Sequence, residues 1–326
     1  MYNRPTTMNA AVLHTLGKPP RCEPFAEPIA GDGEVIVHVR AAALKPVDKQ
    51  LASGAHYAST QALPIVCGID GVGHLDDGSR VFFGGIRPPY GAMAQRTVVR
   101  RAFAFAIPDA LSDETAAAIV NPGVSAWLTL AARAKLAPGE NVLILGATGV
   151  TGKLATKIAR LLGAARVVAA GRNKEALSKL HKHGADATVR LDTPADELSE
   201  AFAREAGSSG FQVVIDYVWG KPAEAFLAAI TRKEFAAIGS ETRYVQVGES
   251  AGPAISLPAA VLRSTPLTIM GTAGMPPREV LADALKQVMA HAASGELQIE
   301  TERIPLADIE AAWERDQRGR RFVIIP

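Results

Sequence analysis

The chain has 326 residues, of which 48% are hydrophobic and 21% charged, a composition typical of a folded protein of about two domains. Its 35 basic and 33 acidic side chains nearly cancel, which gives no reason to expect nucleic acid as a partner. Two cysteines, Cys22 and Cys67, cannot build a disulfide framework or a four-cysteine zinc site. Two thiols fit a reducing cytosol, and we expect a cytoplasmic protein. No run of 18 or more apolar residues and no signal peptide is found, so we expect no membrane span.

Short β-like runs separated by Pro- and Gly-rich turns fill the first third of the chain. Residues 9–13 and 34–42 alternate or run apolar, as strands do. Similar runs continue to about residue 99. We therefore expect an irregular, β-rich first domain.

Helices and strands alternate after Ser112, which is a candidate N-cap for a helix beginning near residue 115. Pro122 is expected to interrupt this helix before a second one over about 124–135. Strands separated by helical segments predict parallel βαβ units and an α/β, doubly wound sheet. The expected strands cover residues 142–145, 166–170, 213–217 and 244–247, and the expected helices residues 152–162, 174–183, 222–230 and 277–294. We place one domain at residues 122–266 and the other at residues 1–121 with 267–326.

A glycine-rich turn, "GATGVTG", joins the strand over residues 142–145 to the following helix. Glycine lets backbone amides approach a phosphate, and a helix N-terminus adds free N–H groups and a partial positive charge. The stricter G-x-G-x-x-G fingerprint would have glycine where this chain has Ala147. A structural tight turn is the alternative, and the flanking strands favour a pyrophosphate site. The candidate residues are Ala147, Thr148, Gly149, Val150 and Thr151.

The end of the next strand, "AAGRNKE", indicates the type of dinucleotide. NAD-binding units carry an acidic residue here for the ribose 2′-hydroxyl. This chain has Gly171, Arg172, Asn173 and Lys174 instead. A guanidinium can grip a 2′-phosphate that a carboxylate would repel. The alternative is a solvated helix start, although cations there oppose the helix dipole. We expect NADP(H) rather than NAD(H).

Seven stretches spread over nearly the whole chain carry a family resemblance. They are "AAALKPVDKQLASGAHY", "LPIVCGIDGVG", "YGAMAQRTVV", "NPGVSAW", "ILGATGVTG", "VVIDYVWG" and "GRRFVIIP". In this order the chain resembles the medium-chain dehydrogenases/reductases, in the zinc-free quinone oxidoreductase-like (zeta-crystallin-like) branch. The resemblance implies a GroES-like substrate domain, a Rossmann domain, a cleft between them, and a homodimer formed through the sheet edge around "LTIMGTAG".

The resemblance also implies cofactor contacts outside the glycine-rich turn. One of them, Ser125, matches a family hydroxyl, and an early-helix serine without a role is the alternative. The full set is Pro46, Asp48, Asn121, Ser125, Val218, Gly248, Gly271 and Arg320.

Zinc-containing relatives of this family hold their metal at three places. Here those places have Lys45, Ile69 followed by Asp70, and Asn121. Neither an ammonium nor an isoleucine can ligate zinc at neutral pH, and one Asp is not a site. The resemblance to zinc enzymes therefore does not extend to the metal, and we expect none.

Two residues are candidates for the chemistry. Lys45 stands where relatives usually have Asn, and it could act as a cation near the substrate oxygen or form an ion pair with Asp70 or Asp48. Tyr57 matches a tyrosine that some enoyl-reductase relatives use, and a partly buried loop aromatic is the alternative. Both possibilities stay open for each residue.

The resemblance implies NADPH-dependent reduction of a small quinone or α,β-unsaturated carbonyl compound. Without a metal, substrates already activated by conjugation are favoured over simple alcohols. The alternatives are a saturated-ketone or alcohol dehydrogenase and a non-catalytic NADPH-binding structural or regulatory protein. Nucleic acid and membranes are not expected partners.

Overall fold

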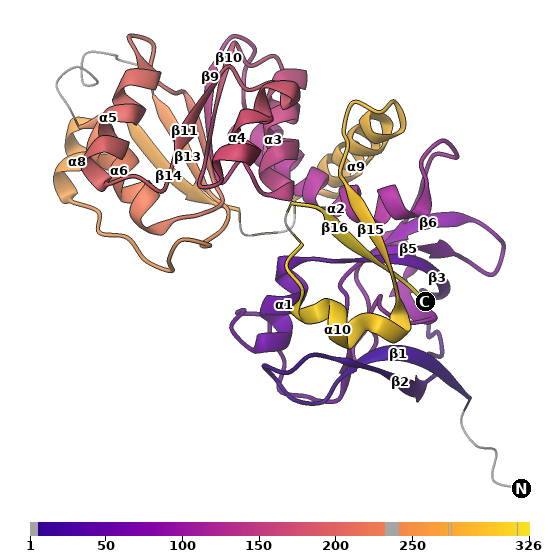
Figure 1. Cartoon of the computed structure of the whole chain (residues 1–326). Helices are drawn as coiled ribbons and strands as arrows, with labels where there is room; N and C mark the ends of the chain where they lie inside the picture. Colours follow the sequence, from indigo (N-terminus) through magenta and orange to yellow (C-terminus); the bar gives the residue numbers. More distant parts are fainter. Residues whose placement is uncertain (1–5, 232–240, 273, 275, 318) are drawn as a thin grey trace, which may run out of the picture. The chain divides into compact units, whose positions relative to one another are not determined.

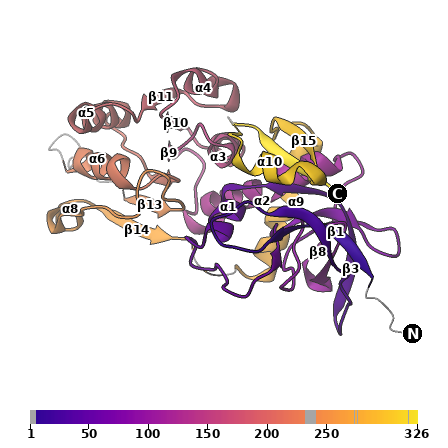
Figure 2. The same ribbon diagram turned by 60° about the horizontal axis from the view of Figure 1, so that its bottom comes forward.

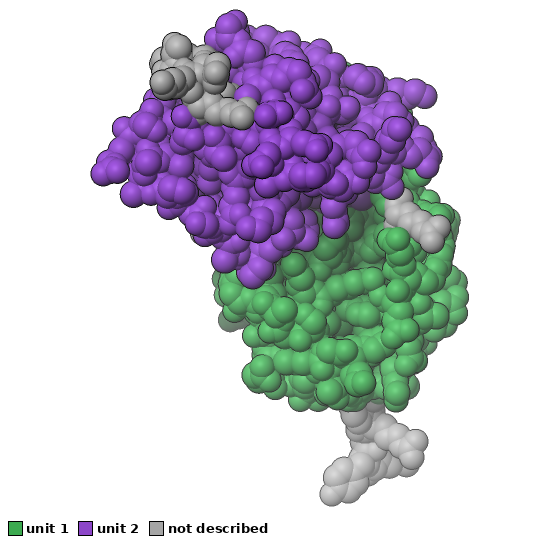
Figure 3. All heavy atoms as spheres, turned by 60° about the vertical axis from the view of Figure 1, so that its left-hand side comes forward, with its two compact units in different colours: residues 1–121, 286–326 green, residues 122–285 purple. Residues whose placement is uncertain are grey.

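The computed structural model describes residues 6–231, 241–272, 274, 276–317 and 319–326. The chain divides into two units, one made of residues 1–121 with 286–326 and the other of residues 122–285 (Figure 3). The sequence places the second boundary near residue 267. In the structure, Leu267–Gly271 pairs in parallel with the strand Thr242–Gln246, so residues 267–285 fall in the second unit.

The first unit is a β-rich domain whose last strand returns to pair with an early one. Strand β16 (Arg321–Ile325) runs antiparallel to β3 (Glu34–Leu44), with Phe322 opposite Leu44. Within the described residues, one sheet has the order β15-β16-β3-β5-β6-β8 with β7 paired to β3, and a smaller one the order β2-β1-β4. The other strands are β1 (Thr7–Leu13), β2 (Arg21–Ala26), β4 (Ile65–Val66), β5 (Gly71–His74), β6 (Arg80–Phe83), β7 (Arg96–Arg100), β8 (Ala104–Ala106) and β15 (Thr301–Pro305).

Apolar side chains from both sheets and two helices form the core of the first unit. Leu13, Val37 and Phe83 are fully buried in it, together with Phe322 from the returning strand. Burial of this kind is the main favourable contribution to folding. The helices are α1 (Pro46–Ser53) and α10 (Ile309–Glu314), with 3₁₀ turns at Arg101–Phe103 and Leu306–Asp308.

The second unit is a doubly wound domain, as the alternating pattern predicts. Its strands are parallel and follow the order β11-β10-β9-β12-β13-β14 within the described chain. Helix α3 lies on one face of this sheet, and α5 packs against α6 on the other (Figures 1 and 2). The strands are β9 (Asn141–Leu145), β10 (Arg166–Gly171), β11 (Ala187–Arg190), β12 (Val213–Asp216), β13 (Thr242–Gln246) and β14 (Leu267–Gly271). The helices are α3 (Val150–Leu161), α4 (Lys174–Ser178), α5 (Ala195–Ala206), α6 (Gly220–Ile230) and α8 (Ala259–Ser264), with a 3₁₀ turn at Leu180–His183 and α9 (Arg278–Ala293) reaching the first unit.

Helix α2 (Asp113–Trp127) corrects one expectation. Ser112 does cap it, since its Oγ accepts a hydrogen bond from the Thr115 N–H at 3.2 Å. However, Pro122 does not end the helix, which continues into a π-helical segment, Leu128–Arg133. Buried positions such as Ile119 and Ala126 flank the proline, so tertiary packing outweighs the lost backbone hydrogen bond.

The segment Asp113–Arg133 is also long and apolar enough to cross a membrane by length and composition. Within its most apolar window, 67% is buried inside the protein, which is the usual property of a core helix.

Candidate functional site

A cavity of about 190 Å³ lies in the second unit, at the carboxyl ends of its parallel strands. The strand order reverses between β9 and β12, and ligands of doubly wound sheets bind at such a switch point. The cavity is lined by Gly146, Thr148, Gly149, Gly171, Arg172, Leu191, Val218, Pro222, Ser250 and Ala251. Five of these residues, Thr148, Gly149, Gly171, Arg172 and Val218, were cofactor candidates from the sequence.

Several glycines in and beside the turn stand where a side chain would not fit or where the backbone needs a positive φ. Gly146 has a φ of +87°, in the left-handed region that favours glycine. A Cβ on Gly152 would lie 2.3 Å from the Gly146 carbonyl oxygen, and one on Gly171 would lie 2.5 Å from Thr148 Cγ2. Gly149 is open, with only the Gly146 carbonyl oxygen 3.5 Å from its would-be Cβ. The turn therefore leaves backbone exposed to a ligand at the start of α3, which fits a bound phosphate.

In the basic stretch after β10, one residue has a structural role and another lines the cavity. The Asn173 side chain accepts a hydrogen bond from the Ala176 N–H at 2.8 Å and so caps α4. Arg172 and Lys174 are exposed, and Arg172 lines the cavity without a hydrogen bond or ion pair to any described residue. Arg172 is thus available to an anionic ligand.

A carboxylate near Arg172 is already occupied. Asp192 accepts two hydrogen bonds from Arg190, at 3.0 and 2.6 Å. Its pKa is lowered mainly by the hydrogen bond from Arg190, with a smaller effect of the Arg172 charge. Because Arg190 already pairs with the Asp192 carboxylate, Asp192 competes less with an anionic ligand for the Arg172 guanidinium.

The other cofactor candidates of the second unit lie outside the lining of the cavity. Ala147 is buried and donates its N–H to the Ala170 carbonyl at 2.8 Å. The Ser125 carbonyl accepts from Thr129, and the Gly271 carbonyl accepts from Arg133. The remaining candidates are Val150 and Thr151 in the first turn of α3, Asn173 and Lys174 at the start of α4, and Gly248, whose N–H donates to the Asp216 carbonyl at 3.1 Å.

Sequence reasoning missed several residues that line the cavity. Leu191, Pro222, Ser250 and Ala251 follow the ends of β11, β12 and β13. Their positions just after predicted strands could have identified them, because the carboxyl ends of parallel strands meet at one edge of the sheet, where ligands bind. No motif marked these residues.

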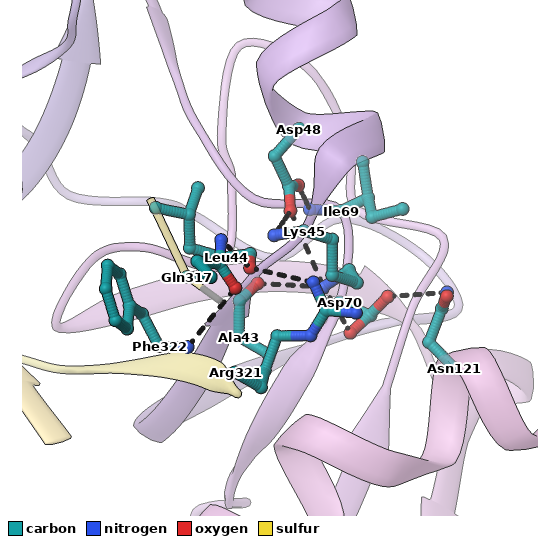
Figure 4. A network of polar contacts seen from close by, with 10 residues as sticks. All are labelled: Ala43, Leu44, Lys45, Asp48, Ile69, Asp70, Asn121, Gln317, Arg321 and Phe322. Carbon is teal, nitrogen blue, oxygen red and sulfur yellow. Dashed lines mark hydrogen bonds and ion pairs between the residues drawn. The ribbon is translucent and has the colours of Figure 1, made fainter. Parts of the chain in front are cut away.

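A network of buried charges lies in the first unit, and its members face one another in Figure 4. Lys45 is 2% exposed, and its Nζ donates to the Ala43 carbonyl at 2.9 Å and to Asp70 Oδ1 at 3.0 Å. The other oxygen of Asp70 accepts from Asn121 Nδ2 at 2.8 Å. The three places at which zinc relatives hold their metal are thus brought together, with the ammonium bound by the carboxylate.

Two further charges complete this network. Asp48 accepts from the Lys45 N–H at 2.8 Å and from the Ile69 N–H at 3.2 Å, while its carboxylate lies 3.7 Å from Lys45 Nζ. Arg321, on β16, is 4% exposed and donates from Nη1 to the Leu44 carbonyl at 3.2 Å. Two cations and two carboxylates therefore share this buried region and neutralise one another.

Burial and charge act in opposite directions on these groups. Burial raises the pKa of Asp70, while the Lys45 ammonium and the Asn121 amide oppose the rise by stabilising the carboxylate. Burial likewise lowers the pKa of Arg321, and the nearby charges of Asp48 and Asp70 oppose that fall. The network holds its charges by mutual pairing, and the contacts of Lys45 favour the ion-pair alternative.

The remaining candidates of the first unit are Tyr57, Arg320 and Pro46. Tyr57 is 96% exposed, with its ring 4.2 Å from the His56 ring, and its hydroxyl has no partner among the described residues. Arg320 pairs with Glu302 at 2.9 Å. Pro46 begins helix α1. The proposed roles of these residues stay predictions.

These side chains do not suit a zinc ion. No group of three or more His, Cys, Asp or Glu residues close enough to hold a metal exists in the described part of the chain. The nearest thiol, Cys67, is 6% exposed, and burial raises its pKa, so it resists forming the thiolate that binds metals. Lys45 holds the central position and already satisfies Asp70.

We accordingly predict that purified, untagged protein contains no stoichiometric zinc. The measurement is elemental analysis, combined with activity before and after chelation. About one zinc per chain, or a loss of activity on chelation that added zinc restores, would contradict this prediction.

Comparison with known proteins agrees with this architecture. The family described as zinc-binding dehydrogenase matches residues 150–290. A probable NADPH-dependent quinone reductase of Emericella nidulans is 31% identical over 222 residues, which cover 64% of this chain and 61% of that protein. The quinone oxidoreductase-like protein 2 of Bos taurus is 32% identical over 184 residues, covering 56% and 50%. The chain thus spans between half and two thirds of the length of these two curated relatives.

Solved structures extend the similarity over the whole chain. The quinone oxidoreductase of Thermus thermophilus, solved also in complex with NADPH, is 28% identical and superposes with a TM-score of 0.78, covering 98% of this chain and 100% of that one. A mycobacterial quinone oxidoreductase shares the fold, with a TM-score of 0.83 at 20% identity and the same coverage. Fold, family match and relatives agree: the chain has the fold of the medium-chain dehydrogenases/reductases and is similar in sequence to quinone oxidoreductase-like members of that family.

Proposed function

We propose that the chain is an NADPH-dependent oxidoreductase that reduces quinones or other α,β-unsaturated carbonyl compounds. The observation that carries this proposal is the glycine-walled cavity at the sheet's switch point, with Arg172 on its lining and unpaired among the described residues. The resemblance to quinone reductases, among them one solved with NADPH, supports it.

In this proposal the second unit binds the dinucleotide. The open backbone at Gly149 and the N-terminus of α3 hold the pyrophosphate, and Arg172 binds the ribose 2′-phosphate, with Lys174 adding charge. The bound nicotinamide supplies the hydride. The protein supplies position and electrostatics, as in other cofactor enzymes.

The first unit bears on the choice of substrate. The residues at the three family metal positions neutralise one another, with Lys45 bound by Asp70 and Asp70 bound by Asn121. They offer no free cation to polarise a simple ketone. Conjugation activates quinones and enones without such help, so these compounds suit the chain better than saturated ketones or alcohols.

The test is NADPH oxidation measured side by side against quinones, enones, enals and saturated ketones. We expect a quinone, an enone or an enal to be reduced at least about tenfold faster than any saturated ketone, a difference in barrier of about 1.4 kcal/mol. Faster reduction of saturated ketones would support an alcohol dehydrogenase instead. Tight NADPH binding without NADPH oxidation in the presence of any of these compounds would support a non-catalytic protein.

The homodimer stays a prediction. Strand β14 is at the edge of the six-stranded sheet of the described chain, where a second copy could add its own strand. Ala273 of the "LTIMGTAG" stretch lies outside the described residues. A monomer mass in sedimentation equilibrium would contradict the dimer.

A further inference from the structure

Asp216 is a buried carboxylate at the carboxyl end of β12, beside the switch point of the sheet. Its Oδ1 accepts hydrogen bonds from the Val218 N–H at 2.7 Å and the Trp219 N–H at 2.9 Å. Its Oδ2 accepts from the Tyr244 hydroxyl. Among the described residues, no cation contacts this carboxylate, so these neutral donors satisfy a fully buried acidic side chain.

The turn that Asp216 holds is strained. Trp219 has φ +57° and ψ −156°, a backbone conformation that is essentially restricted to glycine. Gly220 follows with φ +58°, and a Cβ there would lie 2.7 Å from the Ala251 carbonyl oxygen. A bulky aromatic residue keeps such a conformation only where its surroundings fix it, and the two hydrogen bonds to Asp216 Oδ1 do so.

This turn forms one wall of the cofactor cavity and supports another. Val218 and Pro222 line the cavity from the turn and the start of α6, and Ser250 and Ala251 line it from the segment after β13. The Val218 carbonyl accepts from the Ala251 N–H at 2.7 Å, so the two walls are joined.

The main chain of Asp216 reinforces this junction. Its carbonyl oxygen accepts from the Val247 N–H at 2.8 Å and from the Gly248 N–H at 3.1 Å. One residue therefore fixes the turn through its side chain and the segment after β13 through its backbone.

We propose that Asp216 is a positioning residue for the dinucleotide, which sets the two walls of the cavity formed by Val218 and Ala251 without touching the ligand itself. This inference rests on the proposed function, since it takes the cavity as the dinucleotide site. A carboxylate suits the role because an ionised acceptor makes stronger hydrogen bonds to backbone N–H groups than a neutral one.

The experiment measures the dissociation constant of NADPH by fluorescence titration, well below the melting temperature of each variant. Asp216→Ala removes all three side-chain contacts, and we expect its Kd to rise about tenfold or more, the effect of losing a charge-assisted hydrogen bond. Asp216→Asn keeps an acceptor oxygen for Val218 and Trp219, and we expect it to restore the Kd to within about threefold of the wild type.

Thr242→Val is the matched control. Thr242 is also buried, on the opposite end of β13, where its hydroxyl donates to the Phe211 carbonyl at 2.8 Å. This variant loses a buried hydrogen bond in the same sheet without touching the cavity. It should lower the melting temperature and leave the Kd for NADPH unchanged.

The outcomes separate this inference from the proposed function. Wild-type protein that binds no NADPH would contradict both the proposed function and the positioning role of Asp216. Wild-type protein that binds NADPH, with a folded Asp216→Ala variant within twofold of its Kd, would overturn only the positioning role. Should Asp216→Ala not fold, Tyr244→Phe decides. That variant leaves Asp216 Oδ2 unpaired, so a Kd raised about threefold supports the role and an unchanged Kd rejects it.

Discussion

The Lys45→Met variant is expected to lose about 3–5 kcal/mol of unfolding free energy, the usual result of removing one partner of a buried ion pair. Lys45 is 2% exposed and its Nζ lies 3.0 Å from Asp70 Oδ1. Methionine has a similar length but no charge, so the Asp70 carboxylate would stay buried with only the Asn121 amide donating to it. Chemical denaturation of both proteins measures the difference.

A double-mutant cycle identifies the source of that loss. Asp70→Asn alone should also destabilise the protein, because it leaves the Lys45 ammonium buried with only partial compensation. Lys45→Met combined with Asp70→Asn removes both charges, and we expect its loss to be smaller than the sum of the two single losses by about 1–3 kcal/mol. Additive losses would show that the two side chains do not act as a pair.

Turnover of the same variant tests the catalytic alternative. A cation that stabilises negative charge on a substrate oxygen acts mainly in the transition state, and removing it typically lowers kcat by about 10²–10³-fold. The ion-pair role predicts near-normal kcat in folded Lys45→Met protein, together with reduced stability. A loss of kcat on that scale with unchanged stability and NADPH affinity would make Lys45 a catalytic residue, and a smaller loss in Tyr57→Phe would then place Tyr57 beside it.

The Arg172→Asp variant is expected to bind NADPH more weakly by about 1.5–3 kcal/mol, the range for a hydrogen bond to a charged group. Arg172 lines the cavity and makes no hydrogen bond or ion pair with any described residue. An aspartate there would repel a 2′-phosphate but could accept a hydrogen bond from a 2′-hydroxyl. We therefore expect NADH affinity to stay the same or improve, measured by titration of both cofactors.

Arg263→Asp is the control for net charge. It makes the same change of charge on the exposed surface of α8, away from the residues that line the cavity. It should leave both affinities unchanged at moderate salt, because surface charges beyond about 10 Å are screened. Wild-type protein that binds NADH as tightly as NADPH would show that the interpretation of "GRNK" is wrong.

The local pattern of the sequence was sufficient for the type and order of the elements in the second unit. The alternation of apolar strands with helical segments predicts the parallel sheet, because each pattern depends on the spacing of nearby residues. The "GATGVTG" turn predicts the site at the start of α3 for the same reason: the left-handed backbone at Gly146 and the close approach at Gly152 are local requirements. Arg172 follows from its place at the end of a strand.

Only the tertiary structure decided which distant residues meet. Asp70 lies 25 positions from Lys45 and 51 positions from Asn121, and Arg321 joins them because β16 returns to pair with β3. The resemblance to zinc relatives identified these three positions but left the role of Lys45 open. Spacing along the chain does not determine which donor forms a hydrogen bond with which acceptor.

The need for tertiary structure to bring distant residues together also explains why no motif identified some of the residues that line the cavity. By itself the sequence determined the α/β class, the glycine-rich turn before α3 and the basic end of β10, all of which arise from short-range geometry. It did not determine that Ser250 and Ala251 close the cavity or that Asp216 holds Trp219 in its strained conformation. Those features depend on strand order and on hydrogen bonds between segments that are distant in the sequence, which form only when the sheet is assembled.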